Sequence, residues 1–389
     1  MTALQDGTRG SQRRERLQDR LRALPPVVPV VLGLWLATRA ATALATWAAS
    51  ELLPGRRADQ VPGFVERWTR WDVDLFRKVA EHGYTGFPAD YPDRGIEAVF
   101  PGYPLVLRLV GLVVPSWTVA GLLVSLVGGA VAVVALARLA ALEGAPGERA
   151  VLVLLLSPYA VFLAAAYSEA LFLALALPGW VAARQGRWAA ASVLVALATT
   201  VRITGLFLAV ALVVEHLVRR RGRPDRSTAW LALPFAALAG YWGYLWALTG
   251  DPLRWFSAQR EGWERRLTAP HDALRATLRL AADPAVRSDY GFSFAAEVVA
   301  VAVGVGLAVV LLRRRRWSEA TYVGLSVGAL ATSTFYLSVD RATLLWFPLW
   351  LLLAEVSARR HWVLPAYLTL SAPLSLVLAV AFTSDRWVG

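Results

Sequence analysis

The chain has 389 residues, of which 57 % are hydrophobic and only 17 % are charged, and its mean hydropathy is +0.49. This composition excludes most soluble folds, because apolar runs of about 18 to 25 residues, each long enough to cross a bilayer, recur along the sequence. The formal charge of +12 does not indicate nucleic-acid binding, since the basic residues sit in short clusters between the apolar runs. The absence of cysteine excludes disulfides and thiolate metal sites. The sequence therefore predicts an all-α polytopic membrane protein.

Eleven apolar segments are the expected membrane spans of a single integrated domain, residues 24–389. Before them, residues 1–23 contain six Arg and form the expected cytoplasmic N-terminal segment. The expected spans, in chain order, are residues 24–49, 117–140, 150–166, 169–183, 188–200, 203–218, 229–248, 294–312, 319–338, 342–356 and 363–382.

Dense basic clusters decide the expected orientation. If the spans alternate from a cytoplasmic N-terminus, every dense cluster falls on the cytoplasmic side of the membrane. These clusters are Arg184 with Arg187, residues 219–223, residues 313–316, and Arg359 with Arg360. The two long loops, about 51–98 and 249–293, then face outward. We therefore expect a multi-pass protein of the cell membrane whose candidate polar residues lie on the extracytoplasmic side.

A helical pattern in the first outer loop predicts an interfacial helix. On a 3.6-residue repeat, one face carries the apolar side chains of Trp68, Trp71, Leu75, Phe76, Val79 and Ala80. The opposite face carries Arg70, Asp74, Arg77, Lys78 and Glu81. Gly83 is expected to end this helix. A second short helix, interfacial or re-entrant on the outer side, is expected at residues 100–115, because Pro brackets this apolar stretch.

Asp72 is the anomaly of the first of these helices, because it falls within the apolar stripe between Trp68 and Phe76. A carboxylate turned toward the bilayer or the helix bundle costs several kcal/mol unless something pairs with it. In such surroundings it is suited to accept a proton from an alcohol, which is the role of a general base. An N-terminal helix cap or a structural salt bridge with a nearby Arg explains its position equally well.

Two adjacent spans meet with almost no loop at Tyr167, Ser168 and Glu169. Ser168 has the residue type of a helix N-cap, and Glu169 complements the positive end of the next helix. The alternative is that Tyr167 and Glu169 line a cavity that faces outward.

Two arginines lie at the same side of the expected bundle. Arg202, at the break between two short spans, either extends to lipid headgroups or binds a phosphate through its planar fork of donors. Arg341 either pairs with its neighbour Asp340 or supplies a second phosphate contact.

The second outer loop begins with Arg residues among aromatic ones, including Arg254 and Arg260. Such a pattern anchors a loop at headgroups or binds a phosphorylated or glycosidic ligand. No His spacing of a metal site occurs. A divalent cation held by the oxygens of Asp72, Asp74 and Glu169 is left open, because the spacing of these residues does not decide it.

Six blocks of sequence follow one another along residues 35–356. They are Trp71-Asp72 with Phe76, Val79-Ala80 and Gly83-Tyr84; Phe100-Pro101-Gly102-Tyr103-Pro104-Leu105; Pro158 through Phe172; Thr200 through Gly205; Gly250-Asp251-Pro252-Leu253; and Ser338-Val339-Asp340-Arg341 with Pro348. In this order they resemble the motifs of the PIG-V-like mannosyltransferases, which are polytopic glycosyltransferases of the GT-C class. The resemblance implies a GT-C-like fold.

The resemblance also implies an inverting transfer of a hexose, expected to be mannose, from a polyprenyl-phosphate sugar to an acceptor hydroxyl on the outer face. In that scheme Asp72 is the general base, and Arg202 and Arg341 stabilise the departing polyprenyl phosphate. The expected donor and substrate site also includes Tyr103, Tyr167, Glu169, Arg254 and Arg260. The acceptor, whether lipid, glycan or protein, is not indicated by the sequence.

Two alternatives remain at this point. A polytopic transporter or lipid flippase has the same composition, although such proteins often show inverted repeats, which this sequence does not clearly contain. A GT-C enzyme that uses another polyprenyl-phosphate sugar, such as arabinofuranose, fits the same residues.

Overall fold

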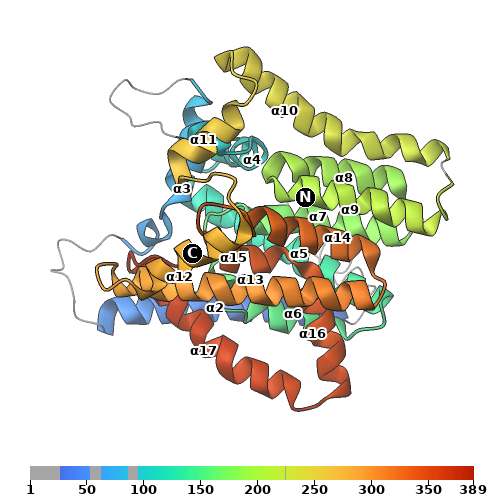
Figure 1. The fold of residues 1–389 in the computed structure, drawn as a ribbon. Helices are drawn as coiled ribbons and strands as arrows, with labels where there is room; N and C mark the ends of the chain where they lie inside the picture. Colours follow the sequence, from blue (N-terminus) through green and yellow to red (C-terminus); the bar gives the residue numbers. More distant parts are fainter. Residues whose placement is uncertain (1–26, 53–62, 86–94, 224) are drawn as a thin grey trace, which may run out of the picture.

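The computed structural model describes residues 27–52, 63–85, 95–223 and 225–389. Within these ranges every regular element is a helix, which confirms the expected all-α class (Figure 1). The basic N-terminal segment expected at residues 1–23 lies outside the described residues. Buried residues from most of the helices between α2 and α17 form one large hydrophobic cluster, whereas those of α10 form a smaller cluster with Phe100.

The elements, in chain order, are α2 (Val27–Leu52), η2 (Glu66–Trp68), α3 (Asp72–His82), η3 (Ile96–Ala98), α4 (Gly102–Gly111), α5 (Trp117–Leu142), α6 (Gly147–Leu155), η4 (Ala160–Leu163), α7 (Glu169–Arg184), α8 (Trp188–Val201), α9 (Thr204–Arg219), η5 (Arg226–Ala232), α10 (Leu233–Thr249), α11 (Arg254–Trp263), α12 (Pro270–Ala282), α13 (Ser288–Arg313), α14 (Trp317–Ala331), α15 (Val339–Ala342), η6 (Thr343–Leu345), α16 (Phe347–Arg359) and α17 (Val363–Thr383). The helix expected at residues 100–115 is α4.

The described residues contain five helices that are long and apolar enough to cross a membrane: α2, α5, η5 continued by α10, α13 and α17. A sixth span results if α15 with η6 and α16, which meet at a bend of 70°, count as one broken helix. The expectation of eleven spans is therefore not confirmed. The other expected spans contain helices of only 9 to 16 residues, namely α6, α7, α8, α9 and α14. Turns divide these segments; the expected span 150–166, for example, breaks around Pro158 into α6 and η4.

Close helix packing at the centre of the bundle depends on glycine. Helix α5 packs along α7 and α2, and its Gly128 faces the backbone of Ala170 in α7. Its Gly129 lies against the indole ring of Trp35 in α2, whose Nε1 donates a hydrogen bond to the carbonyl of Leu126 (3.1 Å). A side chain at Gly129 would occupy the space that the Trp35 ring fills.

We expect Gly129→Ala to lower the stability of the protein by about 1 to 3 kcal/mol, because the added methyl group forces the Trp35 ring out of a packed position. The matched control is Gly33→Ala on α2, where an added Cβ meets no atom within 4 Å. This control should be neutral or raise stability by up to about 1 kcal/mol through helix propensity. Thermal unfolding in detergent, followed by tryptophan fluorescence, compares the two variants. Equal midpoints would show that the α2 contact is not tightly packed.

One end of the bundle is held by a network of buried ion pairs. Arg184 at the end of α7 pairs with Glu143 (3.2 Å), Glu215 (2.7 Å) and Glu319. Arg316, which precedes α14, also pairs with Glu319 (2.7 Å) and with Glu143. These contacts join the ends of α5, α7, α9 and α14, and each charge has an opposite partner, as burial requires.

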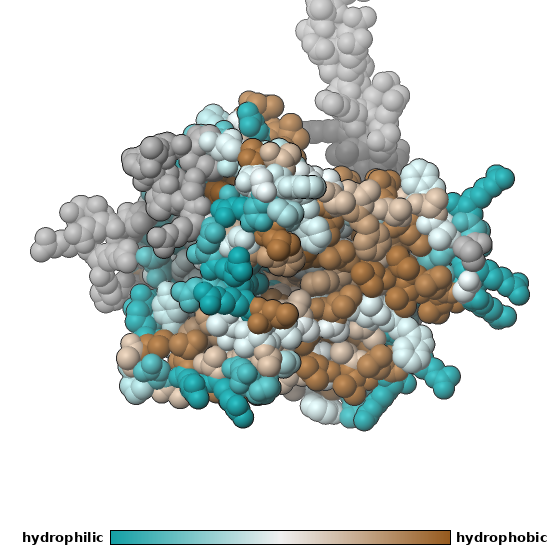
Figure 2. Space-filling model, turned by 45° about the horizontal axis from the view of Figure 1, so that its top comes forward, coloured by the Kyte–Doolittle hydropathy of each residue, from teal (hydrophilic) through white to brown (hydrophobic). Residues whose placement is uncertain are grey.

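The four basic clusters of the sequence lie at this same end. Arg219 pairs with Glu215 of the network (2.9 Å), and Arg314 and Arg359 share Glu355 (2.6 and 2.9 Å). Figure 1 shows the turns after α9 and α13 on the right and the turn after α16 at the bottom, whereas α3, α11 and α12 lie on the left and α15 lies near the middle. Figure 2 shows hydrophilic residues toward both ends of one face, with apolar residues between them. The charged ends are thus separated by an apolar part of the molecule.

Candidate functional site

Helix α3 presents Asp72 at its first turn. The helix begins at Asp72 and ends before Gly83, whose positive φ of 74° and N–H bond to the Val79 carbonyl close it as the sequence predicts. The start differs from the expectation, because Trp68 lies in η2 and Trp71 precedes the helix. A carboxylate in the first turn of a helix is favoured by the partial positive charge of the unpaired backbone N–H groups.

Trp71 adopts a backbone conformation that few non-glycine residues accept, with φ at 46° and ψ at −113°. Its indole packs edge to face on Phe382 (5.4 Å between ring centroids) and on Trp387 (5.5 Å). Such strain persists only where the surroundings enforce it, and it gathers at functional sites. Here it turns the chain so that Asp72 follows directly as the first residue of α3.

The side chain of Asp72 pairs with Arg341, and its Oδ2 lies 3.2 Å from Nη1 of Arg341. The two side chains are 21 % and 10 % exposed, so the pair is largely shielded from water. Of the two structural alternatives for Asp72, the salt bridge is therefore observed, whereas the cap is not, because Trp71 occupies the N-cap position. The pair joins the first outer loop to the C-terminal third of the chain.

Arg341 is held in place by α15 and its surroundings. Glu297 of α13 accepts backbone N–H bonds from Ser338, Val339 (2.6 Å) and Asp340 (3.2 Å), so its carboxylate satisfies the N-terminus of this short helix. The predicted ion pair of Asp340 with Arg341 is replaced by a bond from the backbone N–H of Arg341 to Oδ1 of Asp340 (2.6 Å). The guanidinium of Arg341 is therefore available for other carboxylates.

The guanidinium of Arg341 rests on two aromatic rings. Its Cζ lies 5.1 Å from the ring centroid of Phe162 and 5.3 Å from that of Tyr167. Aromatic faces attract cations within about 6 Å, and the attraction grows where water is excluded. These contacts fix the orientation of the guanidinium group that pairs with Asp72.

Glu169 links the two predicted arginines. Its Oε1 lies 2.8 Å from Nη1 of Arg202 and 3.2 Å from Nε of Arg341, and the side chain is fully buried. Ser168 accepts a hydrogen bond from Nη1 of Arg202 (2.8 Å) and makes no side-chain cap bond to α7. Arg202 follows α8 in an extended conformation, so the break predicted there is observed. The result is a chain of charges that runs from Asp72 through Arg341 and Glu169 to Arg202.

Tyr167 and Tyr103 lie in the core that supports α3. The Tyr167 hydroxyl donates to the carbonyl of Arg70 (3.1 Å), two residues before Asp72. The Phe76 ring on α3 packs on Tyr103 (4.9 Å) and on Tyr167 (5.9 Å). Both tyrosines are buried, and neither lines the cavity described next. Their contacts hold the helix that carries Asp72.

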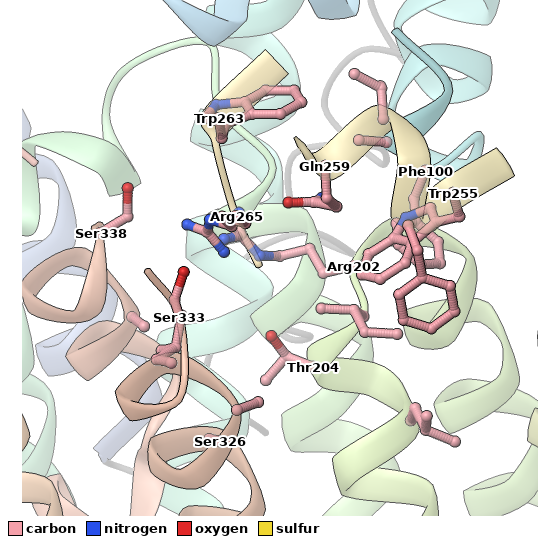
Figure 3. A pocket seen from close by; sticks show the side chains of 18 of the residues that line it. Phe100, Arg202, Thr204, Trp255, Gln259, Trp263, Arg265, Ser326, Ser333 and Ser338 are labelled. Carbon is pink, nitrogen blue, oxygen red and sulfur yellow. The ribbon is translucent and has the colours of Figure 1, made fainter. Parts of the chain in front are cut away.

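A cavity of about 590 Å³ opens beside Asp72. Its polar end is lined by Asp72, Arg202 and Arg341, together with Arg265 and Ser338. Figure 3 labels Arg202, Arg265 and Ser338 of this group. Its other walls are largely apolar and come mainly from α9, α10, α11 and α14, with the side chains of Ile203, Leu206, Phe207, Trp242, Trp255, Phe256, Ala329 and Leu330. Polar groups at one end of an apolar cavity are the usual arrangement of a site for an amphipathic small molecule.

The two arginines predicted on α11 have different surroundings. Arg260 lines the cavity and donates to Oγ of Ser257 (3.1 Å). Arg254 does not line it; Nε and Nη2 of Arg254 each lie 2.9 Å from an oxygen of Glu97. The hydrogen bond to Glu97 raises the pKa of Arg254 above its ordinary value, although burial opposes this rise. Arg254 thus ties α11 to η3, and a role in substrate binding stays a prediction.

Sequence reasoning missed Arg265, Gln259 and Trp263 as residues that line the cavity. Arg265 was only one of several arginines among aromatic residues in the second outer loop. Nothing in that pattern separates an arginine that turns into the protein from one that anchors the loop at headgroups. The distinction depends on the path of the chain after α11, where Nη2 of Arg265 donates to the carbonyl of Leu337 (3.0 Å).

The three carboxylates considered as cation ligands do not come together. Asp74 pairs with Arg77 (2.8 Å) and Lys78 (3.0 Å). Burial raises the pKa of Asp74, but the hydrogen bonds from Arg77 and Lys78 outweigh it and leave the pKa below its ordinary value. Asp72 and Glu169 are bridged by Arg341. In the part of the chain that the structure describes, no group of three or more His, Asp or Glu side chains is placed to hold a metal ion.

Comparison with known proteins agrees with the motifs. Residues 31–220 match the family model of the mannosyltransferases described as Mannosyltransferase (PIG-V). The GPI alpha-1,6-mannosyltransferase 2 of Mus musculus is 37 % identical over 169 residues, which are 40 % of this chain and 33 % of the mouse protein. The proteins of the same name from Cricetulus griseus and Rattus norvegicus are both 36 % identical, over 38 % and 40 % of this chain and 31 % and 33 % of their own lengths.

These matches confirm the predicted similarity to PIG-V-like mannosyltransferases. The alignments span about a third of the length of the curated relatives. The matched range 31–220 includes Asp72, Tyr103, Tyr167, Glu169 and Arg202, whereas α11 and α15 lie after it.

Proposed function

We propose that this protein transfers mannose from polyprenyl-phosphate-mannose to an acceptor hydroxyl, with inversion at the sugar carbon. The observation that carries the proposal is Asp72, a shielded carboxylate paired with Arg341 at the polar end of a cavity whose other walls are largely apolar. A lipid-linked donor has the same division between a polar head and an apolar chain. The family match and the names of the relatives support the sugar and the reaction class. A GT-C architecture is part of the same proposal.

In the proposed reaction, Asp72 removes the proton from the acceptor hydroxyl through the carboxylate oxygen that does not face Arg341. The acceptor oxygen then forms a bond to the anomeric carbon of mannose, while the bond from that carbon to the phosphate oxygen breaks. The electron pair of the broken bond stays on the phosphate, which leaves as polyprenyl phosphate. Guanidinium groups at the polar end of the cavity stabilise the charge that develops there. One carboxylate therefore suffices for a single displacement with inversion.

We also propose that the site faces the extracytoplasmic side. The basic clusters lie at the opposite end of the bundle from α3 and α15, together with the ion-pair network around Arg184 (Figure 1). Positively charged loops favour the cytoplasmic side of a membrane. A donor that is already linked to a lipid needs no nucleotide-binding site there.

The direct test supplies purified protein with radiolabelled polyprenyl-phosphate-mannose and membrane lipid extract, and mass spectrometry identifies the molecule that gains a hexose. We expect transfer from this donor and none from GDP-mannose. A parallel arm with polyprenyl-phosphate-arabinofuranose decides the sugar. Passage of the labelled donor across proteoliposomes without any covalent product would contradict the proposal and indicate a transporter or flippase.

A further inference from the structure

The positive charges at the polar end of the cavity are not equally compensated. Arg341 pairs with both Asp72 and Glu169, and Arg202 pairs with Glu169. Arg265 lines the same cavity, but among the described residues it forms no ion pair. Arg260 and Arg266 also line the cavity without an ion pair in the described residues. Of these three arginines, Arg265 is the one whose Nε is shielded from solvent.

Arg265 also has unused hydrogen-bonding capacity. Its Nη2 donates to the carbonyl of Leu337 (3.0 Å), whereas its Nε is shielded from solvent and has no hydrogen-bond partner within the described ranges. A buried N–H group without a partner costs free energy, and a cation without a counter-charge costs more. A ligand that brings an acceptor to this position would remove that cost.

The surroundings of Arg265 disfavour its positive charge. Burial, followed by repulsion from Arg341, lowers the pKa of Arg265 to about 10, and attraction to Glu297 and Asp72 only partly opposes this fall. The group remains a cation at neutral pH. Figure 3 shows the side chains of Arg265 and Arg202 extending toward each other from different elements, with Ser333 and Gln259 nearby. An anion between the two guanidinium groups would relieve the repulsion and use their free donors.

We propose that Arg265 is the principal ligand of the phosphate group of the isoprenoid donor, with Arg202 as its second cation, whereas Arg341 positions Asp72. This proposal rests on the proposed function and assigns separate tasks to the three arginines. The phosphate lies at the polar end of the cavity, and the isoprenoid chain follows the apolar walls of α9, α10 and α14. When the bond to the sugar carbon breaks, the departing phosphate oxygen gains charge, and Arg265 stabilises that charge.

The experiment measures binding of farnesyl phosphate, a short isoprenoid phosphate, to the purified protein by quenching of tryptophan fluorescence. We expect Arg265→Met to raise the dissociation constant by roughly tenfold to a hundredfold, as expected for loss of a charge-assisted hydrogen bond. Arg265→Lys should retain part of the affinity. Farnesol, which lacks the phosphate, should bind wild type and Arg265→Met equally. The control is Arg275→Gln on α12, an exposed arginine (68 %) outside the cavity, which should bind as wild type does.

A second variant separates this role from a structural one. Asp72→Asn should bind farnesyl phosphate at least as tightly as wild type, because it removes a negative charge near the proposed phosphate position. Unchanged affinity in Arg265→Met would overturn the proposal, as would equal binding of inorganic phosphate and farnesyl phosphate. The binding assay needs no turnover, so its result is independent of the transfer assay. A protein that binds farnesyl phosphate through Arg265 but transfers no sugar would refute the proposed function and leave the role of Arg265 in binding intact.

Discussion

Asp72→Asn is expected to reduce sugar transfer by about a hundredfold to ten-thousandfold, the usual contribution of a general base. Asparagine has nearly the same shape as aspartate and still accepts a hydrogen bond from Arg341, but it cannot take the proton of the acceptor hydroxyl. The fold should persist, because Arg341 keeps its second carboxylate, Glu169. Initial rates of transfer from polyprenyl-phosphate-mannose at saturating donor measure the effect, and thermal unfolding confirms that the variant is folded.

The matched control is Asp74→Asn on the same helix. Asp74 is 43 % exposed and pairs with Arg77 and Lys78, so the substitution removes a carboxylate from the same turn without touching the cavity. Its transfer rate should stay within about twofold of wild type, since exposed ion pairs contribute little. If Asp72→Asn transferred sugar as fast as this control, the assignment of the base would be wrong.

The features of the site that depend on neighbouring residues could be predicted from the sequence. Periodicity predicted a helix that runs from about Trp68 to Gly83, of which residues 72–82 are observed as α3, and it marked Asp72 as out of place in the apolar stripe. The break at Arg202 was visible as an interruption between short apolar segments. Each of these features depends on residues within one or two helical turns. Local physical preferences of the chain are therefore sufficient to predict them.

The partners of these residues were not predictable in the same way. Arg341 pairs with Asp72 across 269 positions of sequence, and local pattern instead favoured Asp340 as its partner. Arg254 and Arg265 occur in the same aromatic-rich loop, but one binds Glu97 and the other turns into the cavity. Tertiary packing determines which carboxylate each arginine meets, and the periodicity of a single sequence contains no information about that packing.

Hydropathy predicts more spans than the lengths of the described helices support, and the difference has a physical reason. Helices α7 and α8 are apolar because they pack against other helices, and residues such as Trp180 and Ala191 are completely buried. A helix that is apolar on all sides has the same hydropathy whether lipid or protein surrounds it. Length separates the two cases here, since α7 and α8 have 16 and 14 residues whereas α5 and α13 each have 26.

Among the residues of the site, we expect substitution of Glu169 to lower the stability of the protein most, because its carboxylate pairs with two arginines at once. We expect Glu169→Gln to lower stability by about 3 to 5 kcal/mol, the cost of leaving a buried charge without its partner. It should also reduce sugar transfer strongly, because Arg341 would lose the contact that holds it beside Asp72. Thermal unfolding in detergent measures the first effect, and transfer from polyprenyl-phosphate-mannose measures the second.

Glu261→Gln provides the comparison, because Glu261 also pairs with an arginine, Arg254 (3.0 Å), but is 44 % exposed. Its unfolding midpoint should match that of wild type, as is usual for surface ion pairs. Glu169→Asp keeps the charge at a shorter reach and should recover part of the stability and activity lost in Glu169→Gln. If Glu169→Gln unfolded at the wild-type midpoint, the two arginines would not depend on this carboxylate, and the chain of charges from Asp72 to Arg202 would not be what holds Asp72 in place.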